Sequence, residues 1–444
     1  MTMKIVEMIK DSKILNLSEL FQNMNSVDIA RNMMELENKD LILAFRILSK
    51  NTAAEVFSYL NKEYQQHIIE TIADDEVKEI IEKLFLDDTV DLIEELPTNV
   101  VKKVLRNTSI EKRELINTFL QYNESSAGSI MTIEFIDLKE EMTVKEAINY
   151  TRKVGFNKEI TDTCFVIDKD RNLKGTLKLK DLILNEEENL IYNIMDKNII
   201  SVKTIEDQEN VASLFKVYDL LSMGVVDKEG RLVGMITIDD VVDIIEQENT
   251  EDFQKMAAMV PSKEPYLQTS VFQLAKSRVV WLLVLMISAT ITGSIIKQFD
   301  EVLQSVVILA AFIPMIMDTG GNAGSQSSTL VIRGLALGDI KMKDYLKVMW
   351  KEFRVSLIVA SILAGVNFLR IYFLETTDIM ITFTVCGSLF FTVIIAKVVG
   401  GILPIIAKKL KLDPAIMASP LITTIVDAFA LTVYFGLAKV FLGL

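Results

Sequence analysis

The 444-residue sequence predicts a multi-domain protein, with an all-α helical-repeat domain at the N-terminus, an α/β pair of domains in the middle, and an α-helical transmembrane domain with five spans. Three observations predict this fold class. Charge is divided unevenly along the chain, a strand–turn–strand pattern occurs twice, and long apolar segments follow one another towards the carboxyl end. A chain of this length is also too long for one ordinary domain.

Charge separates the two halves of the chain. From Lys276 onward there are 15 Lys and Arg against 10 Asp and Glu, a net charge of +5, and the whole chain carries −14, so residues 1–275 carry −19. An acidic half of this size repels the phosphates of nucleic acid and attracts cations. Its first residues lack the apolar core of a signal peptide, so we expect this half to remain in the cytosol.

The sequence is poor in soft metal ligands. It contains one histidine, His67, and two cysteines, Cys164 and Cys386, which lie far apart in the chain. This composition argues against a transition-metal site and against a disulfide framework. Any dedicated metal site must therefore use oxygen ligands, which suit hard cations such as Mg²⁺ or Ca²⁺.

Residues 1–129 predict a domain of short amphipathic helices. Apolar residues recur at helical spacing in Ala54–Leu60 and again in Val90–Leu96. The two stretches align at an offset of 36 residues, and a helical repeat of that period indicates stacked helix pairs. A plain helical bundle, with a chance similarity between its helices, is the alternative.

Residues 130–246 contain the same order of strand, turn, strand and helix start twice. The pattern covers Cys164–Ile183 and returns 59 residues later in Val225–Val242, with hairpin-like turns between β-branched runs. The aligned pairs are Asp168 with Asp227, Leu173 with Leu232, Gly175 with Gly234, and Asp181 with Asp240. This pattern resembles a tandem pair of cystathionine-β-synthase-type (CBS) domains, and the resemblance implies a regulatory module that often binds nucleotides or ions.

Residues 247–275 predict an acidic connecting helix between this module and a membrane domain over residues 276–444. Glu248, Glu251 and Asp252 recur at spacings that share one helix face. Pro261 and Pro265 then break the helix before the first apolar segment.

Five apolar segments predict the membrane spans. They are Val279–Ile296, Val302–Met317, Val355–Phe373, Ile379–Ile406 and Ala415–Leu442. Most approach the ~20 residues needed to cross a hydrocarbon core of about 30 Å. The second segment is followed closely by Gly320 and Gly321, so we expect the span to continue after them as a second half-helix through Leu335. A soluble protein would have to bury all five segments as core helices, which argues against that alternative.

Basic residues predict the orientation of the spans. Most lie in the connections between the second and third segments and between the fourth and fifth: Lys341, Lys343, Lys347, Lys351, Arg354, Lys408, Lys409 and Lys411. The opposite side has only Lys297, Arg370 and Lys439. This distribution places the N-terminus in the cytosol and the C-terminus outside the cell.

A glycine-rich polar stretch, Pro314–Asp339, lies inside the membrane domain. We expect the glycines at 320, 321 and 324 to interrupt the helix, because irregular backbone at membrane depth is tolerated where it lines an aqueous cavity. The freed carbonyls, with Asn322, Ser325 and Gln326, would then offer neutral oxygens to a hydrated cation. A small-residue face for helix packing is the alternative.

Asp427 lies within the fifth apolar segment, where an ionisable residue is costly and is usually functional. Ser419, Thr423 and Asp427 recur every four residues and share one helix face, and Pro420 loosens the backbone near them. Mg²⁺ keeps its waters, so a carboxylate with water-bridging oxygens suits it. The alternative is a buried Asp427 paired with Lys397.

The whole chain resembles the MgtE family of magnesium channels. The motifs that carry this resemblance are the Gly-Gly-Asn-Ala-Gly-Ser-Gln run from Gly320 and the segment from Leu412 to Asp427. The resemblance implies a homodimer with a pore between subunits, lined by the second and fifth helices. It implies that Asp427 holds hydrated Mg²⁺, with Thr423 and Ser419 beside it. Gly321, Asn322 and Gly324 match the family's pore-lining loop.

The same resemblance implies acidic sensor sites that bind cytosolic Mg²⁺. The matching positions lie in the N-terminal domain, the second CBS copy, the acidic helix and the start of the fifth span: Asp87, Asp91, Asp207, Glu209, Asp219, Asp240, Asp243, Glu248, Glu251, Asp252 and Asp413. Bound Mg²⁺ would remove the repulsion between these carboxylates and close the cytosolic module, as a ligand does when it binds one of two states better.

The sequence therefore predicts a Mg²⁺ channel or transporter for uptake across the cell membrane, gated by cytosolic Mg²⁺. Its partners would be a second copy of the chain, Mg²⁺ or other divalent cations, and membrane lipid, with no nucleic acid. A carrier coupled to Na⁺ or H⁺ is the alternative. A membrane-bound enzyme or sensor is less well supported, because the membrane half contains no nucleophile–base constellation and the chain contains no P-loop pattern.

Overall fold

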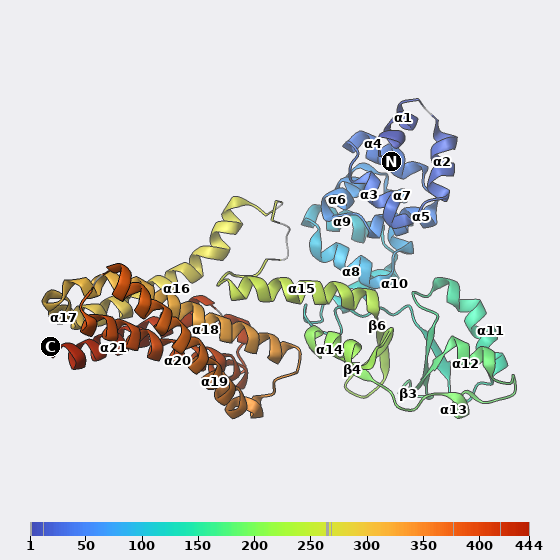
Figure 1. The fold of residues 1–444 in the computed structure, drawn as a ribbon. Helices are drawn as coiled ribbons and strands as arrows, with labels where there is room; N and C mark the ends of the chain where they lie inside the picture. Colours follow the sequence, from blue (N-terminus) through green and yellow to red (C-terminus); the bar gives the residue numbers. More distant parts are fainter. Residues whose placement is uncertain are drawn as a thin grey trace. The chain divides into compact units, whose positions relative to one another are not determined.

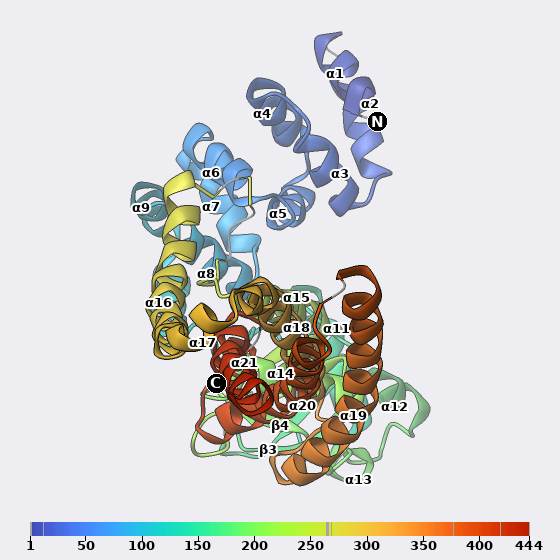
Figure 2. The same cartoon turned by 60° about the vertical axis from the view of Figure 1, so that its left-hand side comes forward.

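The computed structural model describes residues 2–11, 13–262, 266–267, 269–375, 377–417 and 419–443, without the side chains of residues 2, 4, 10 and 419. The chain forms two compact units, residues 1–245 and 246–444 (Figures 1 and 2). Each unit is described by itself below. The first holds a helical domain and two small sheets, and the second holds the long apolar helices.

Short helices of 8 to 10 residues build the N-terminal domain. They are α1 (Thr2–Lys10), α2 (Ile14–Gln22), α3 (Ser26–Met33), α4 (Asn38–Ile47), α5 (Lys50–Ser58), α6 (Lys62–Thr71), α7 (Asp74–Lys83), α8 (Leu86–Glu95), α9 (Thr98–Asn107) and α10 (Ile110–Phe119). Helix α3 packs on α5, α5 on α7 and α7 on α9, while α4 packs on α6. Alternate helices therefore form rows, as the predicted stacked pairs require, and a plain bundle does not describe the domain.

Lysine side chains join successive repeats. Lys103 of α9 donates from Nζ to the carbonyl oxygens of Ile69 and Ile72, at 2.6 and 2.8 Å. Lys112 of α10 donates in the same way to the carbonyl oxygens of Ile81 and Leu84, both at 2.6 Å. The last carbonyls of a helix lack partners within that helix and carry partial negative charge. Each ammonium group therefore stabilises the end of an earlier helix, α6 or α7.

The α/β part contains two three-stranded sheets with the same topology. Their elements are β1 (Ile136–Lys139), α11 (Val144–Val154), the 3₁₀ turn η1 (Gly155–Asn157), β2 (Thr163–Ile167), β3 (Leu173–Lys178), α12 (Leu179–Leu184), α13 (Ile191–Ile194), β4 (Ser201–Lys203), α14 (Gln208–Tyr218), β5 (Ser222–Val226), β6 (Leu232–Thr237) and α15 (Ile238–Met256). In each sheet the central strand pairs parallel with one neighbour and antiparallel with the other. The repeat in the sequence is thus a repeat in the fold.

The two copies exchange their opening segments. Thr132, which opens the first copy, bonds through its backbone to Met235 of the second, at 2.8 and 2.9 Å. Asp196, which opens the second copy, bonds in the same way to Thr176 of the first. A Cβ on Gly175 would lie 2.6 Å from Met195 Sδ, and one on Gly234 would lie 2.5 Å from Met131 Sδ. The aligned glycines therefore make room for the methionines of the exchanged segments.

The second unit contains the membrane helices and their connections. These are α16 (Val271–Gln298), α17 (Asp300–Ser305), η2 (Val307–Phe312), α18 (Ile313–Ala336), η3 (Met342–Asp344), α19 (Tyr345–Arg370), the π-helical turn η4 (Ile371–Glu375), α20 (Ile379–Lys409), η5 (Pro414–Met417) and α21 (Ser419–Leu442). The described residues include five helical segments long and apolar enough to cross a membrane, as predicted. Helices α18, α20 and α21 lie side by side (Figures 1 and 2), while α16 buries none of its own residues within the described chain. An apolar helix with an exposed surface is what a lipid environment requires.

The expected break in the second span is wrong. Helix α18 runs without interruption through Gly320, Gly321 and Gly324, so their carbonyls stay in the helix ladder. All three glycines are buried, and a Cβ on Gly321 would overlap Thr423 of α21. The glycines therefore let neighbouring helices approach closely, which was the alternative interpretation. Pro420 likewise lies in the first turn of α21, where its missing N–H costs nothing.

Helices α18 and α20 approach each other to backbone contact at Gly324 and Gly400. A Cβ on Gly400 would overlap the carbonyl group of Gly324, which is backbone and cannot rotate away. We expect Gly400→Ala to destabilise the membrane unit by about 3 kcal/mol, the upper end of the usual cost of overpacking. The measurement is thermal unfolding of the purified protein in detergent. Gly365→Ala is the matched control, because a Cβ there meets no atom within 4 Å; equal melting temperatures for the two variants would contradict the packing.

Candidate functional site

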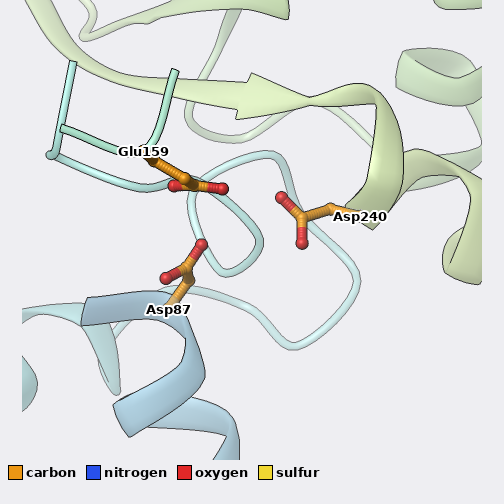
Figure 3. Close-up of side chains that lie close together, drawn as sticks. All are labelled: Asp87, Glu159 and Asp240. Atoms are coloured by element: carbon orange, nitrogen blue, oxygen red, sulfur yellow. The ribbon is translucent and has the colours of Figure 1, made fainter. Parts of the chain in front are cut away.

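Three carboxylates from three separate elements meet in the first unit, and we call them the carboxylate triad: Asp87, Glu159 and Asp240 (Figure 3). One oxygen from each lies within 4.8 Å of the other two. Asp87 is in the first turn of α8, Asp240 in the first turn of α15, and Glu159 follows the turn η1. Figure 3 shows the three side chains pointing towards one another. The triad thus joins the helical domain to both halves of the α/β part.

Local structure fixes each of the three side chains. Asp87 and Asp240 lie at helix N-termini, where the helix dipole favours negative charge. Asp240 Oδ2 accepts a 2.6 Å hydrogen bond from the Thr237 hydroxyl, and Asp87 Oδ1 accepts one from its neighbour's backbone N–H. The backbone N–H of Glu159 donates to the Glu134 carbonyl at 3.0 Å. Glu159 Oε2 is buried without a hydrogen-bond partner among the described residues.

Burial and mutual repulsion disfavour the ionised triad. Burial, followed by the negative charges of Glu159, Asp88 and Asp240, raises the pKa of Asp87 well above its usual range. Burial and then the charge of Asp240 raise the pKa of Glu159 in the same direction. Burial raises the pKa of Asp240 to about 6, although the Thr237 hydrogen bond opposes the change. No basic side chain within the described residues forms an ion pair with any of the three. The charge of Lys112 acts on Asp87 without an ion pair, so the negative charge of the triad is only partly compensated.

The triad fits a hard divalent cation. It offers only carboxylate oxygens, which Mg²⁺ and Ca²⁺ prefer. Mg²⁺ binds oxygen at about 2.0–2.1 Å, so two ligands on opposite sides of one ion stand about 4.2 Å apart. Separations of up to 4.8 Å between the three oxygens are close to that span, and water could complete the coordination. A cation here would also supply a partner for the buried oxygen of Glu159.

A second polar contact lies within the second unit, where the end of α15 meets the segment before the fifth span. Lys255 Nζ forms ion pairs with Glu251 and with Asp413, the latter at 2.6 Å. We call this set the Lys255 bridge. Burial alone would lower the pKa of Lys255, but the hydrogen bonds to Asp413 and Glu251 raise it. Burial and then the charge of Asp413 raise the pKa of Asp252 to about 6. The acidic helix and Asp413 therefore meet through the ammonium group of Lys255.

The membrane unit places Asp427 beside the glycine run. Gly320 packs against Val426, and Gly321 packs against Thr423, so α21 presents this face to α18. Asp427 Oδ1 is buried and has no hydrogen-bond partner in the described part of the chain. The Thr423 hydroxyl donates to the Pro420 carbonyl at 3.0 Å, and Asn322 lies exposed on α18. The side chain of Ser419 falls outside the described residues.

Lys397 does not partner Asp427. This lysine of α20 is 5% exposed, and its Nζ donates to Gln326 Oε1 at 3.3 Å. The structure thus pairs the membrane lysine with the polar face of α18, and the alternative of a buried Asp427–Lys397 ion pair is wrong.

Comparisons with known proteins identify the family of this chain. Residues 313–437 match the family model described as MgtE, divalent cation transporter, residues 24–125 match the MgtE intracellular N domain, and residues 191–247 match a CBS domain. The magnesium transporter MgtE of Thermus thermophilus is 33% identical over 100% of this chain and 98% of its own length. The one of Bacillus subtilis is 31% identical over 99% of this chain and 97% of its own.

The chain belongs to the MgtE family of magnesium transporters.

Solved structures agree with the fold of the first unit. The soluble part of a magnesium transporter aligns with 56% of this chain at a TM-score of 0.53 and 27% identity, over 97% of its own length. The cytosolic domain of the Mg²⁺ channel MgtE in complex with ATP aligns with 55% of the chain at a TM-score of 0.52 and 31% identity, over all of its own length. The protein is therefore a multi-pass membrane protein with a helical domain and a CBS pair.

Several predicted ligands of this MgtE protein lie apart from the triad. Asp207 caps α14, where its side chain accepts a hydrogen bond from the Glu209 N–H, and Asp219 ends that helix in a left-handed conformation. Both aspartates, Glu209 and Asp243 are exposed. Asp91 lies one turn after Asp87 on α8, where burial and then the charges of nearby acids, among them Asp240, raise its pKa to about 7. Among the described residues, the triad is the one group of three acids close enough to share an ion. Metal binding at these five positions stays a prediction.

The structure also adds residues that the sequence did not single out. Glu159 lies in an irregular segment between a helix and a strand, where one acid carries no periodic signal. Lys255 is one cation in an acidic helix, and only the fold places it against Asp413. The glycines at 321 and 324 were predicted to line a pore, but the structure buries them in helix contacts.

The triad predicts an unusual pH dependence for the cytosolic fragment, residues 1–275. Because folding raises the pKa of these acids, the folded state is penalised only when they are ionised. This penalty is absent below the ordinary carboxyl pKa near 4, and it reaches its full size above the pKa values that the acids have in the folded state. In EDTA, stability should therefore fall between pH 5.5 and pH 8, with Asp240 alone contributing roughly 1 kcal/mol in this window, because most of its effect is already complete below pH 6. Mg²⁺ should raise the melting temperature more at pH 8 than at pH 5.5.

Two variants separate the triad from the general acidity of the fragment. Asp87→Asn combined with Asp240→Asn should flatten the pH dependence and remove most of the Mg²⁺ effect. Asp170→Asn, at an exposed turn, should leave both unchanged. If the double variant keeps the wild-type response to pH and Mg²⁺, the triad is not a cation site.

Proposed function

We propose that this chain is a Mg²⁺ channel that works as a homodimer in the cell membrane, with its N-terminus in the cytosol and its C-terminus outside. The observation that carries this proposal is Asp427, a carboxylate inside a membrane helix whose buried oxygen has no partner within the described residues. Such a group is costly in lipid unless it faces an ion path. Membership of a magnesium transporter family supplies the cargo.

The exposed polar face of α18 supports a pore between two copies. Asp318, Asn322 and Gln326 follow one another every four residues and are exposed, whereas the glycines on the other face are buried. Polar side chains cannot face hydrocarbon without cost, so this face needs water or protein beside it. A second copy that presents the same face would enclose an aqueous path, with Asp427 nearby.

The triad supports gating by cytosolic Mg²⁺. Without a cation, three buried carboxylates repel one another and favour separation of the elements that carry them. Mg²⁺ that binds among them stabilises the assembled arrangement and shifts the population towards it. Because α15 contains both Asp240 and Lys255, this helix connects the triad to the Lys255 bridge along the chain. High cytosolic Mg²⁺ would thereby close the path and limit further uptake.

The pore assignment is tested by substitution of Asp427. We expect Asp427→Ala to abolish Mg²⁺ flux and Asp427→Asn to lose most of it, because the negative charge attracts the cation. The measurement is Mg²⁺ uptake into proteoliposomes without a Na⁺ or H⁺ gradient, so that flux through wild-type protein also argues against a coupled carrier. Glu301→Gln, an exposed acid on α17, is the control. Wild-type flux through the Ala variant would refute the assignment.

The gating route is tested on α15. We expect Glu248→Gln with Glu251→Gln and Asp252→Asn to leave conduction intact and to weaken inhibition by cytosolic Mg²⁺. The reason is that the variant removes Glu251 from the Lys255 bridge, Asp252, whose charge interacts with Asp413, and Glu248, which lies near Asp252. Flux is compared at low and high Mg²⁺ on the cytosolic face, with Glu246→Gln as a control on the same helix. Closure at the wild-type midpoint in the triple variant would show that α15 does not couple the triad to the pore.

A further inference from the structure

Asp318 is the single acid within α18, and its carboxylate lies on the polar face that would line the proposed pore. It lies two residues before the glycine run, on the exposed face that also carries Asn322 and Gln326. Within the described chain, no basic side chain forms an ion pair with Asp318 or with Asp427. An unpaired carboxylate on a membrane helix calls for an explanation, because its cost in lipid is several kcal/mol.

Contacts between α18 and α21 fix the level of Asp318. Gly324 packs against Ile422, Gly321 against Thr423 and Gly320 against Val426, so residue numbers fall along α18 as they rise along α21. The two helices are therefore antiparallel at this contact. Asp318 lies three residues before Gly321 on α18, and Asp427 lies four residues after Thr423 on α21. In an antiparallel pair both steps lead in the same direction from the Gly321–Thr423 contact. At 1.5 Å per residue these steps are about 4.5 and 6 Å, which places both carboxylates at the same level.

Helical periodicity places the two acids beside the contact between the helices. Asp427 is four residues from Thr423 on the same face of α21, and Asp318, on the exposed face of α18, lies about 60° around the helix from Gly321. The carboxylates are also close enough for their charges to interact. The neighbouring α20 contributes Thr392, which packs on Gly320, and Lys397, which is held by Gln326.

We propose that Asp318 is a second cation-contacting residue of the pore, and that each subunit contributes a pair of carboxylates, Asp318 and Asp427, at one level of the path. This inference rests on the proposed function, since it assigns a further residue to the same pore. A second carboxylate doubles the fixed charge at this level. Coulomb attraction grows with the product of the charges, so the pair favours divalent over monovalent cations more strongly than one carboxylate does. Hydrated Mg²⁺ can accept such contacts through its waters.

The test uses the full-length protein in proteoliposomes and measures Mg²⁺ flux against Mg²⁺ concentration on the outer face. We expect Asp318→Asn to raise the half-saturating concentration on the order of tenfold, because the cation loses one neighbouring charge. Asp318→Glu, which keeps the charge, should stay near the wild-type value. Glu301→Gln, at the exposed acid of α17, should not change it. Elution as a single folded species from size-exclusion chromatography establishes that each variant is intact.

The outcomes separate this inference from the proposed function. A shifted half-saturation in Asp318→Asn, with normal values in the Glu and control variants, supports the carboxylate pair. Wild-type half-saturation in Asp318→Asn overturns it, while the Asp427 result leaves the pore assignment in place. Equal impairment of the Asn and Glu variants also overturns it, because the residue would then matter for packing and not for charge. Absence of Mg²⁺ flux through wild-type protein would instead refute the proposed function.

Discussion

Repulsion between buried carboxylates is the interaction on which this structure depends. Asp87, Glu159 and Asp240 come from the helical domain and from both CBS copies, and each is held in place by its own local structure. An arrangement that concentrates negative charge in this way has an unfavourable energy until a cation or a proton joins it. We propose that a divalent cation stabilises this assembled state, so that its stability would depend on the cation concentration.

Close packing in the membrane domain serves a different purpose. Gly320, Gly321 and Gly324 remove side chains where α18 meets α20 and α21, so the helices approach to backbone distance. The same helix then presents its polar residues on the opposite face. Rigid contact on one face and hydration on the other allow acidic side chains to be held at a defined level within a membrane. In the proposed pore, the second face would line the ion path, and the first would fix its position.

The fold could be predicted from local signals in the sequence. The features that depend on tertiary contacts, the packing of the glycine run and the position of Glu159, could not. Hydrophobic periodicity, the internal repeat and the apolar segments determine helices, sheets and spans, and all three were confirmed. The glycine run was misinterpreted because composition alone fits either a broken helix or a packing face. The spacing of these residues favours a packing face. The glycines at 320, 321 and 324 occupy one helix face, and the polar residues at 318, 322 and 326 occupy another. Glu159 gave no comparable signal, because its segment has no period.

Small-angle X-ray scattering from the cytosolic fragment, residues 1–275, tests the central claim most directly. The radius of gyration is compared in EDTA and in millimolar Mg²⁺, with ionic strength held constant so that general screening does not change. The account predicts a compact fragment with Mg²⁺ and an expanded one without it, and it predicts that Asp87→Asn with Asp240→Asn stays compact in EDTA. The same radius of gyration for the wild-type fragment in both solutions would contradict it.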